Sequence, residues 1–455
     1  MQKEPKNRII AALDIGTTKV CALVGRRDAH GRLEILGLGK VESAGVMRGV
    51  VTNIEKTVQA IREACEIAKE QAGVTFDTVH VGIAGQHIKS LQHRGMMMRD
   101  NTTSEIGARD IDKLIADMHK LVLPPGDKIL HVIPQEYTVD NEQGIVDPIG
   151  MSGTKLEANF HIITGQITAS NNIHRCVERA GLKMANVTLE PIASAASVLY
   201  EDEKQAGVAL VDIGGGTTDI TIFQDGIIRH TAVIPFGGHV ITKDIKAGCT
   251  VMDQHAEKLK VKYGSALASE VFENRVIVIP GLRGREPKEI SEKNLSLIIQ
   301  ARVEEIIEHV SWEIRRSGFE NKLIGGIVLT GGGSLLRDIE KLMEVQTGHS
   351  TRLGTPIEHL SHGYNAKLTS PIYATGVGLL LQAFADIDAG RILPAEAKKK
   401  EEVEAEAKAK AAAEAAAKAR QEAEAQRVAA EEEGWLGNIF KKTKEWFEAE
   451  PDADF

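Results

Sequence analysis

Several features are scarce in this chain of 455 residues, and each scarcity excludes a class of protein. There are only four cysteines, and no two of them form a Cys-x-x-Cys pair: Cys21, Cys65, Cys176 and Cys249. This pattern fits a reduced compartment better than a disulfide framework or a zinc site. The most apolar stretch, residues 372–385, is too short to span a bilayer, so any membrane attachment is expected to be peripheral. The formal net charge is −9, which argues against a nucleic-acid partner.

Glycine, by contrast, is abundant and clusters in two similar loops. Asp14-Ile15-Gly16-Thr17-Thr18-Lys19 follows one apolar run, and Asp212-Ile213-Gly214-Gly215-Gly216-Thr217-Thr218-Asp219 follows another. Each pattern predicts a strand, a tight turn and a return strand. Glycine N–H groups can approach a phosphate closely, threonine hydroxyls add donors, and an aspartate ending the first strand can orient a metal-bound water. Two such loops predict a duplicated domain that holds a phosphate tail from both sides.

A third glycine cluster lies near the end of the second half. Thr330-Gly331-Gly332-Gly333-Ser334 follows an apolar run at 323–329 and precedes a predicted helix at 335–342. A strand–glycine–helix junction lets the backbone approach a ligand and directs a helix N-terminus at it. Any one cluster alone is equally well explained as a plain turn. Three clusters in this order favour a nucleotide site.

The order of these loops resembles that of the actin, Hsp70 and sugar kinase superfamily. The resemblance implies an α/β fold of two lobes, built from duplicated ribonuclease H-like domains, with ATP and Mg²⁺ between them. Two further segments, 190–196 and 373–378, resemble the superfamily's connecting helices. Small residues in the second of these segments would allow the helices to cross closely.

A middle insertion narrows the resemblance to one family. Residues 147–158 and 160–164 resemble subdomain 1C of FtsA, the bacterial actin-like cell-division family, and so do residues 45–49, 81–85 and 236–245. The resemblance covers about 8–390. The resulting division assigns 1–85, 166–205 and 361–394 to lobe 1A, 86–165 to an α+β 1C insertion, 206–244 and 311–360 to lobe 2A, and 245–310 to a helical 2B subdomain.

The family resemblance also implies roles for individual residues. The phosphates would be held by Gly16, Thr17, Thr18 and Lys19 together with Gly214, Gly215, Gly216, Thr217 and Thr218. Asp14 and Asp212 would bind Mg²⁺ through water, and Glu190 is the candidate for a catalytic group near those waters. The adenosine would lie against Gly331, Gly332, Gly333 and Ser334. Glu257 and Lys260 resemble ribose and adenine contacts, although a charged helix face explains them equally well.

The composition changes abruptly after Pro394. Residues 395–433 contain 16 Ala, 11 acidic and 8 basic residues, which cannot build a core and predict a helical spacer of about 60 Å. Residues 434–455 then predict an amphipathic helix. Its apolar side carries Trp435, Leu436, Ile439, Phe440, Trp446 and Phe447, and lysines flank that side. This arrangement is typical of a helix that lies in the surface of an anionic membrane.

Together these features predict an ATP-binding cell-division protein on the cytoplasmic face of the membrane at the division site. The resemblance implies that subdomain 2B binds the C-terminal tail of FtsZ, that the chain forms filaments, and that other division proteins bind it. ATPase activity is expected to be weak at most. Two alternatives stay open: a pilus-assembly actin homologue, which also carries a 1C-type insertion, and a small-molecule kinase. A kinase would need an acceptor pocket and a base, for which the sequence has no signature.

Overall fold

The computed structural model describes residues 8–99, 104–281, 286–361, 366–390 and 441–444. The chain divides into two compact units, residues 1–392 and 393–455. In the second unit, residues 441–444 form an exposed helical segment. The predicted spacer and the six apolar residues of the predicted membrane helix lie outside the described residues. Among the described residues, no helix combines the length and apolarity needed to cross a bilayer.

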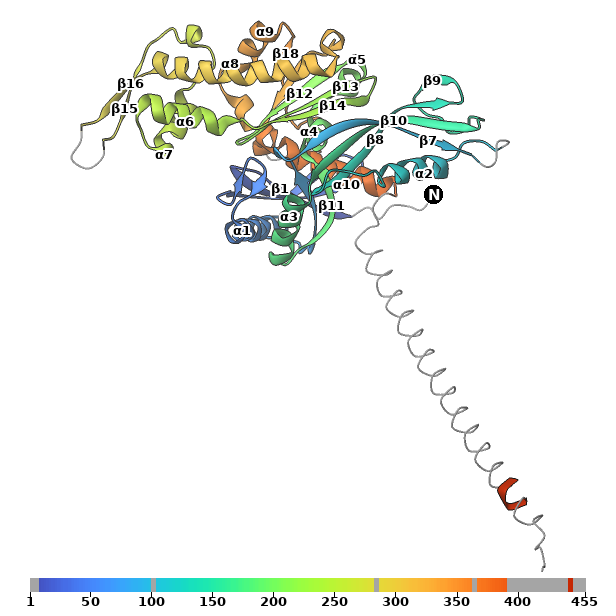
Figure 1. Cartoon of the computed structure of the whole chain (residues 1–455). Helices are drawn as coiled ribbons and strands as arrows, with labels where there is room; N and C mark the ends of the chain where they lie inside the picture. The colour runs from blue at the N-terminus through green and yellow to red at the C-terminus, as the bar shows by residue number, and fades with distance from the viewer. Residues whose placement is uncertain (1–7, 100–103, 282–285, 362–365, 391–440, 445–455) are drawn as a thin grey trace, which may run out of the picture. The chain divides into compact units, whose positions relative to one another are not determined.

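Lobe 1 is a five-stranded sheet with helices on both faces (Figure 1). The strand order is β11 (Lys183–Leu189), β6 (Thr78–Ile83), β1 (Ile9–Ile15), β2 (Lys19–Arg27) and β3 (Leu33–Glu42). Alternate residues of β1 face opposite sides. Leu13 packs with α1 (Ile54–Ala72) and α3 (Ile167–Arg179), whereas Ala12 packs with α10 (Ala374–Asp388). The sheet is therefore buried on both faces, which explains why β1 is almost continuously apolar.

The ends of α1 illustrate how local sequence sets an element. The side chain of Asn53 accepts a hydrogen bond from the backbone N–H of Lys56 at 3.0 Å, which satisfies a free donor of the first turn. Gly73 ends the helix in the left-handed region, with φ +63°. Both residue types are typical of these positions, so the local sequence explains where α1 begins and ends.

Lobe 2 repeats the plan of lobe 1. Its sheet has the order β14 (Ile227–Ile234), β13 (Thr218–Gln224), β12 (Val208–Ile213), β17 (Ile327–Thr330) and β18 (Thr351–Leu353). In both lobes an antiparallel three-stranded meander is followed by two parallel strands. Helices α6 (Gly238–Cys249), α8 (Glu292–Ser317) and α9 (Ile339–Thr347) pack on one core of this sheet. The predicted duplication is confirmed.

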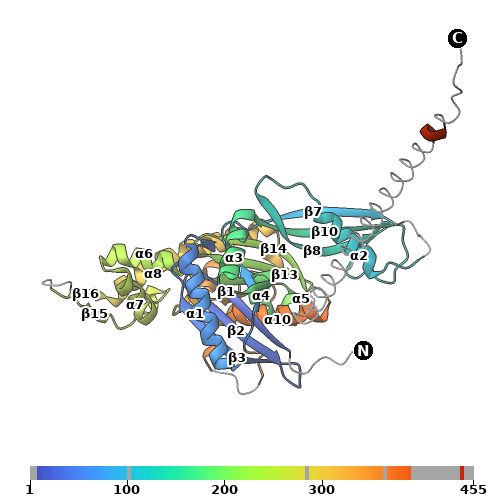
Figure 2. The same cartoon turned by 90° about the horizontal axis from the view of Figure 1, so that it is seen from below.

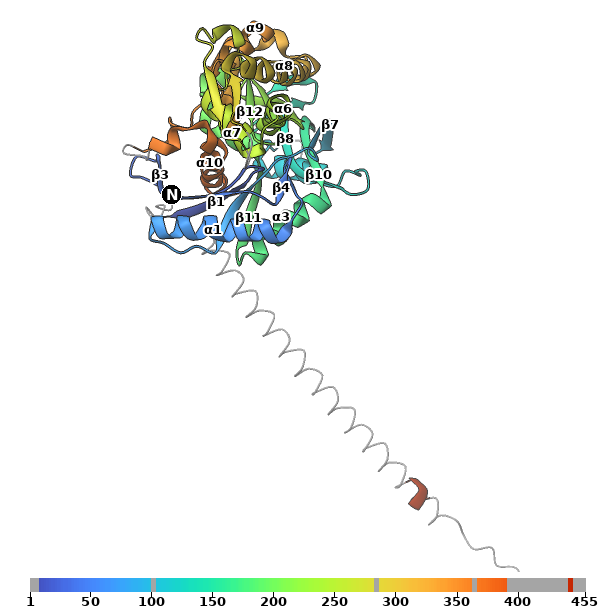
Figure 3. The same ribbon diagram turned by 90° about the vertical axis from the view of Figure 1, so that its left-hand side faces the viewer.

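The part of lobe 2 predicted as 2B is mainly helical. It comprises the end of α6, α7 (Asp253–Tyr263), most of α8, and a hairpin of β15 (Val276–Ile279) and β16 (Lys288–Ser291). Figure 3, turned by a quarter about the vertical axis, shows α6, α7 and α8 grouped together. Buried residues Leu259, Leu295 and Ile299 join these helices to the core of the lobe.

The middle insertion is a four-stranded antiparallel sheet with one helix. The strand order is β7 (Lys89–Met98), β10 (Lys155–Gln166), β8 (Asp127–Val139) and β9 (Glu142–Ile145), and α2 (Ala108–Met118) packs on one face. Leu114 and Met118 of α2 meet Leu156 and Phe160 of β10 in a separate small core. This α+β module is the predicted 1C insertion.

The two lobes are joined through α4 (Glu190–Val198) and α10, with α5 (Glu201–Ala206) following α4. A Cβ atom at Gly378 would lie 1.7 Å from the carbonyl oxygen of Ala193, so only glycine permits this crossing. The predicted close approach of the connecting helices is confirmed. The remaining short elements are β4 (Val46–Met47), β5 (Val50–Val51), and 3₁₀ turns at Ala268–Glu270, Glu320–Lys322, Gly332–Leu335, Ala366–Thr369 and Pro371–Tyr373.

One predicted element is wrong in its bounds. The helix expected at 335–342 begins only at Ile339, and a 3₁₀ turn takes its place after the third glycine cluster. The backbone of Leu336 is extended and that of Asp338 is left-handed, with φ +62°, so the chain turns before the helix starts. The third loop therefore presents a glycine turn, and not the first turn of α9, to its surroundings.

Candidate functional site

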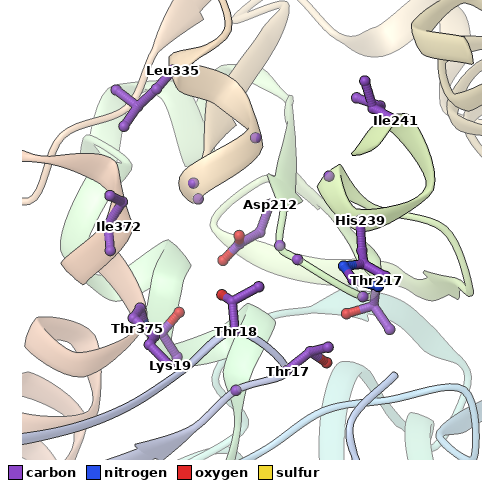
Figure 4. A pocket seen from close by; sticks show the side chains of 18 of the residues that line it. Thr17, Thr18, Lys19, Asp212, Thr217, His239, Ile241, Leu335, Ile372 and Thr375 are labelled. Carbon is purple, nitrogen blue, oxygen red and sulfur yellow. The ribbon is translucent and has the colours of Figure 1, made fainter. Parts of the chain in front are cut away.

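A cavity of about 520 Å³ lies between the two lobes. Figure 4 shows the turn of lobe 1, with Thr17 and Thr18, facing Asp212 and Thr217 of lobe 2. The lining combines the first loop, the second loop, the third glycine loop and α7. Its polar and glycine members are Asp14, Gly16, Thr17, Thr18, Lys19, Lys40, Gly49, Glu190, Asp212, Gly214, Gly215, Gly216, Thr217, Asp219, Gly238, His239, Glu257, Lys260, Lys262, Gly264, Gly331, Gly332, Gly333, Arg337 and Thr375.

The first two loops are turns of equal length. The N–H of Gly16 donates to the carbonyl of Lys19, and the N–H of Gly214 donates to the carbonyl of Thr217, both at 2.9 Å. The turns touch each other: a Cβ at Gly215 would lie 2.3 Å from the methyl carbon of Thr18. Glycine at this position therefore allows the two lobes to bring their turns together.

The third loop packs directly on the end of β12. Gly331 has φ +82°, and a Cβ there would lie 2.2 Å from Oδ1 of Asp212. A Cβ at Gly333 would lie 2.3 Å from Cγ2 of Ile213. Both positions require glycine, for conformation in the first case and for space in both. The loop thus adds a third backbone wall to the cavity.

Four carboxyl groups meet at the base of the cavity: Asp14, Glu190, Asp212 and Asp219. Burial, followed by the neighbouring Asp14 and Asp219, raises the pKa of Glu190 well above its usual range. Burial also raises the pKa of Asp212, although Ser194, whose hydroxyl donates to Oδ2 at 2.8 Å, opposes this effect. Burial and the charge of Asp212 raise the pKa of Asp219 to about 8. The site is therefore short of positive charge.

Lys19 is in direct contact with one member of this carboxyl cluster. Its ammonium group forms an ion pair with Asp14, and both side chains are largely buried. Burial is the largest single influence and lowers the pKa of Lys19. The charge of Asp14, the hydrogen bond to it, and the nearby Cys21 and Glu190 together outweigh burial and raise the pKa above the usual range. Lys19 therefore stays charged and neutralises one of the four carboxylates.

Glu257 and Lys260 also line the cavity, from one face of α7. Nζ of Lys260 donates to Oε2 of Glu257 at 2.8 Å, to the carbonyl of Gly238 at 2.9 Å and to Oγ1 of Thr242 at 2.8 Å. These bonds anchor α7 to the start of α6. The pair therefore has a structural role in addition to its place in the wall.

Two predicted ligands do not reach the wall. Thr218 is the first residue of β13 and is fully buried, and its hydroxyl donates to the carbonyl of Phe236 at 2.8 Å. The hydroxyl of Ser334 donates to the carbonyl of Gly331 at 2.7 Å, which holds the third loop in shape. The structure brings the other predicted nucleotide and metal residues together around the cavity.

Sequence reasoning missed some of the lining. Asp219 is the last residue of the second motif. Its place early in the return strand, close to the turn, could have identified it as a second acidic residue near Asp212. The register pairs the two directly across the β12–β13 ladder. His239, Lys40 and Arg337 also reach the cavity. Lys40 and Arg337 lie in no motif, and His239 lies in the segment 236–245, which the sequence marks for its family resemblance and not as a ligand. Only the folded chain therefore identifies the three as lining residues.

The residues present fit a nucleotide with a hydrated cation. The described residues hold no group of three or more His, Cys, Asp or Glu side chains spaced to bind a metal ion directly. Four carboxyls nevertheless converge, and Oδ1 of Asp219 accepts no hydrogen bond from any described residue. Such groups suit a cation held through water, and the glycine turns suit phosphate oxygens.

Solved structures with this fold place the chain in a class. The PilM–PilN type IV pilus biogenesis complex aligns with a TM-score of 0.61 and 14% identity, covering 83% of this chain and 99% of that one. MreB5 of Spiroplasma citri bound to ADP aligns with a TM-score of 0.51 and 15% identity, covering 85% and 99%. The molecule has the actin-like fold.

Sequence comparison identifies the family within that class. The profile of "Cell division protein FtsA" matches residues 209–378, and that of the "SHS2 domain inserted in FTSA" matches 85–164, which is the 1C insertion. FtsA of Pseudomonas aeruginosa is 43% identical over 84% of this chain and 90% of its own length. FtsA of Escherichia coli is 34% identical over 84% and 91%. The chain belongs to the FtsA family of cell division proteins.

Proposed function

We propose that this chain binds ATP with Mg²⁺ in the cavity between its lobes and tethers FtsZ filaments to the cytoplasmic face of the membrane at the division site. The observation that carries the proposal is the convergence of three glycine loops on one cavity in a chain of the FtsA family. Membership of that family favours a division protein over the pilus homologue and the kinase considered above.

Each part of the site has a role in this proposal. Backbone N–H groups of Gly215 and Gly216, with the hydroxyls of Thr17 and Thr18, would bind the phosphates. Gly16 and Gly214 would shape the two turns, because their own N–H groups donate within them. Lys19 would add a positive charge beside them. Asp14, Asp212 and Asp219 would hold the water shell of Mg²⁺, which neutralises phosphate charge and orients water. Glu190 is the candidate for accepting a proton from an attacking water, a role that requires the bound cation to favour its ionised form.

The adenosine would lie between the third glycine loop and α7. Gly331, Gly332 and Gly333 offer backbone groups, and Glu257 and Lys260 offer polar groups from α7. Hydrolysis is expected to be weak at most. The nucleotide would act mainly by holding the two lobes together.

The partners of the proposed tether are assigned to separate parts of the chain. Subdomain 2B, residues 245–310, would bind the C-terminal tail of FtsZ, and the 1C insertion would contribute to filament formation. Residues 434–455 would bind the anionic membrane surface through the apolar side that begins with Trp435. Because that helix is short and amphipathic, the attachment would be peripheral and reversible.

Sedimentation with anionic lipid vesicles tests the tether. The full chain with ATP should pellet with vesicles and bring FtsZ into the pellet. The variant Trp435→Glu should remain in the supernatant because it puts a charge into the apolar side. Trp312→Glu is a matched control, since Trp312 lies half-exposed on α8, far along the chain from the tail. Equal sedimentation of both variants would refute the proposed membrane helix.

Hydrogen exchange of the full chain tests the FtsZ contact. A peptide of the FtsZ C-terminal tail should protect amides within residues 245–310 and leave those of residues 104–166 unchanged. Protection confined to the 1C insertion would place the partner elsewhere. A fluorescent ATP analogue, added without peptide or lipid, tests nucleotide binding separately.

A further inference from the structure

The 1C insertion belongs to lobe 1 by connectivity, yet it is hydrogen-bonded to lobe 2. It leaves lobe 1 after β6 and returns at α3. Ile88 and Ile163, near its two ends, are buried in the core of lobe 1 together with residues of β1 and α1. The insertion is therefore fixed to lobe 1 by packing.

The contact with lobe 2 is made on β14. This strand is the edge of its sheet, so its outer carbonyl groups have no strand partner there. Figures 1 and 2 both show β14 beside β8 and β10 of the insertion. Polar side chains of the insertion can therefore satisfy the backbone carbonyls that β14 leaves without a strand partner.

Side chains of the insertion donate to three of those carbonyls. Nε2 of Gln135 donates to the carbonyl of Ile228 at 2.7 Å. Nε2 of Gln92 donates to the carbonyl of Arg229 at 3.3 Å, and the hydroxyl of Ser90 donates to that of Thr231 at 3.0 Å. The donors come from β7 and β8, so two strands of the insertion take part.

A buried histidine completes the contact. Nε2 of His161 lies 2.9 Å from Oγ1 of Thr231, and its Nδ1 lies 3.1 Å from Nε2 of Gln92. Because the amide of Gln92 donates, Nδ1 accepts and Nε2 carries the hydrogen that reaches Thr231. His161 is 1% exposed and Thr231 is 4% exposed. Loss of either partner would leave a buried polar group unsatisfied, which is costly.

The contact continues on both sides of β14. On the insertion side, Arg229 forms an ion pair with Glu136 at 2.7 Å. On the other side, His230 lies 2.9 Å from Glu313 of α8, the long helix that reaches into 2B. The strand therefore connects the insertion to the helical part of lobe 2.

We infer that the 1C insertion acts as a clamp across the lobes: its polar contacts with β14 restrain opening of the nucleotide cavity and so slow nucleotide release. The proposal rests on the proposed function, because it assumes that a nucleotide leaves through separation of the two turns that meet at Thr18 and Gly215. It goes beyond that function by giving the insertion a role within one molecule. If the contacts between 1C and β14 break, nucleotide release becomes faster, so the rate of release would depend on the position of 1C.

Two threonines on neighbouring strands provide a matched pair of variants. Thr231→Val removes the hydroxyl that meets His161. Thr221→Val is the control, because Thr221 lies opposite Thr231 in the β13–β14 register and its buried hydroxyl has no hydrogen-bond partner among the described residues. Gln135→Leu is a second clamp variant, with Gln143→Leu on exposed β9 as its control. Circular dichroism and thermal melting verify that all four are folded.

Two measurements on the full chain test the clamp. Hydrogen exchange of β7 and β14 amides should become roughly three- to tenfold faster in Thr231→Val and Gln135→Leu, and stay within twofold in both controls. Release of a fluorescent ATP analogue should be faster by a similar factor in the same two variants. Unchanged exchange in both clamp variants would refute the contact, and faster exchange with unchanged release would refute the restraint on the cavity. If the wild-type chain binds no nucleotide, the proposed ATP function fails, and exchange alone then decides the contact.

Discussion

In lobe 1 the turn between β1 and β2 carries one glycine, two threonines and a lysine, whereas the turn of equal length in lobe 2 carries three glycines and a threonine. The registers make the comparison position by position. Ile15 pairs with Val20 and Asp14 with Cys21; Ile213 pairs with Thr218 and Asp212 with Asp219. The two turns therefore share the same backbone pairing but differ in the chemistry of their side chains.

The difference in chemistry concerns charge above all. The β1–β2 hairpin of lobe 1 supplies one carboxylate and the lysine that neutralises it. Lobe 2 supplies two carboxyls directly opposite each other on a ladder, an arrangement that is unfavourable when both are ionised. The pKa of each lobe 2 carboxyl is raised in consequence of burial, and that of Asp219 also by its neighbour. Lobe 2 is thus the side on which a cation would be most stabilising.

The largest expected effect comes from breaking the ion pair of lobe 1. Lys19→Met should lower the free energy of unfolding by about 3–5 kcal/mol, because it leaves Asp14 buried and unpaired. The double variant Lys19→Met/Asp14→Asn should recover most of that loss. Chemical denaturation at pH 7 measures both. A double variant no more stable than the single one would show that the pair is not what stabilises this turn.

The second effect is a pH dependence that belongs to lobe 2. Asp219 has a folded pKa of about 8, against an unfolded value near 3.8. Between these values only the folded state holds the proton, so its contribution to stability falls as pH rises and is constant above about pH 8.

Comparison with Asp219→Asn isolates this contribution. From pH 6 to pH 8 the wild type should lose about 2.5 kcal/mol of stability relative to Asp219→Asn, since one proton gives about 1.4 kcal/mol per pH unit. Urea denaturation of both proteins at each pH, without nucleotide or Mg²⁺, measures the difference. A constant difference would mean that Asp219 is ionised throughout.

The third effect concerns the space at equivalent positions of the two turns. Gly215→Val should weaken binding of fluorescent ATP by roughly tenfold or more, about 1.4 kcal/mol, because the new side chain would collide with Thr18. Circular dichroism should stay near that of the wild type. Thr17→Val, a β-branched residue at the equivalent position of lobe 1, should cost less because it removes only one hydroxyl. Similar losses of ATP affinity in Gly215→Val and Thr17→Val would show that the two positions are not packed differently.

The smallest effect is expected at Thr218, which the sequence places beside the phosphates. Its hydroxyl donates to the carbonyl of Phe236, so Thr218→Val should leave ATP affinity within twofold and reduce stability by about 1 kcal/mol. Titration with fluorescent ATP and thermal melting measure the two quantities. A large loss of affinity would restore Thr218 to the nucleotide site.

Much of the fold could be predicted from the sequence because its signals are local. Apolar strands ending in aspartate and glycine predict the two hairpins, and Asn53 and Gly73 predict the limits of α1. The insertion was recognisable from its motif and has its own core around Phe160. The start of α9 was not predictable in the same way, because Asp338 adopts a left-handed backbone where it meets a residue distant in sequence: the hydroxyl of Ser265 donates to Oδ2 of Asp338 at 2.8 Å.

The sequence by itself determined the three glycine loops, the acidic residues that follow the strands and the family of the chain, because strand patterns and motifs are carried by neighbouring residues. Only the tertiary structure decided which residues reach the cavity. It excluded Thr218 and Ser334, added Asp219 and His239, and brought Ser90, Gln135 and His161 of the insertion against β14. These contacts join residues that are distant along the chain. The hydrogen bonds and charge interactions between them form only once both lobes have folded.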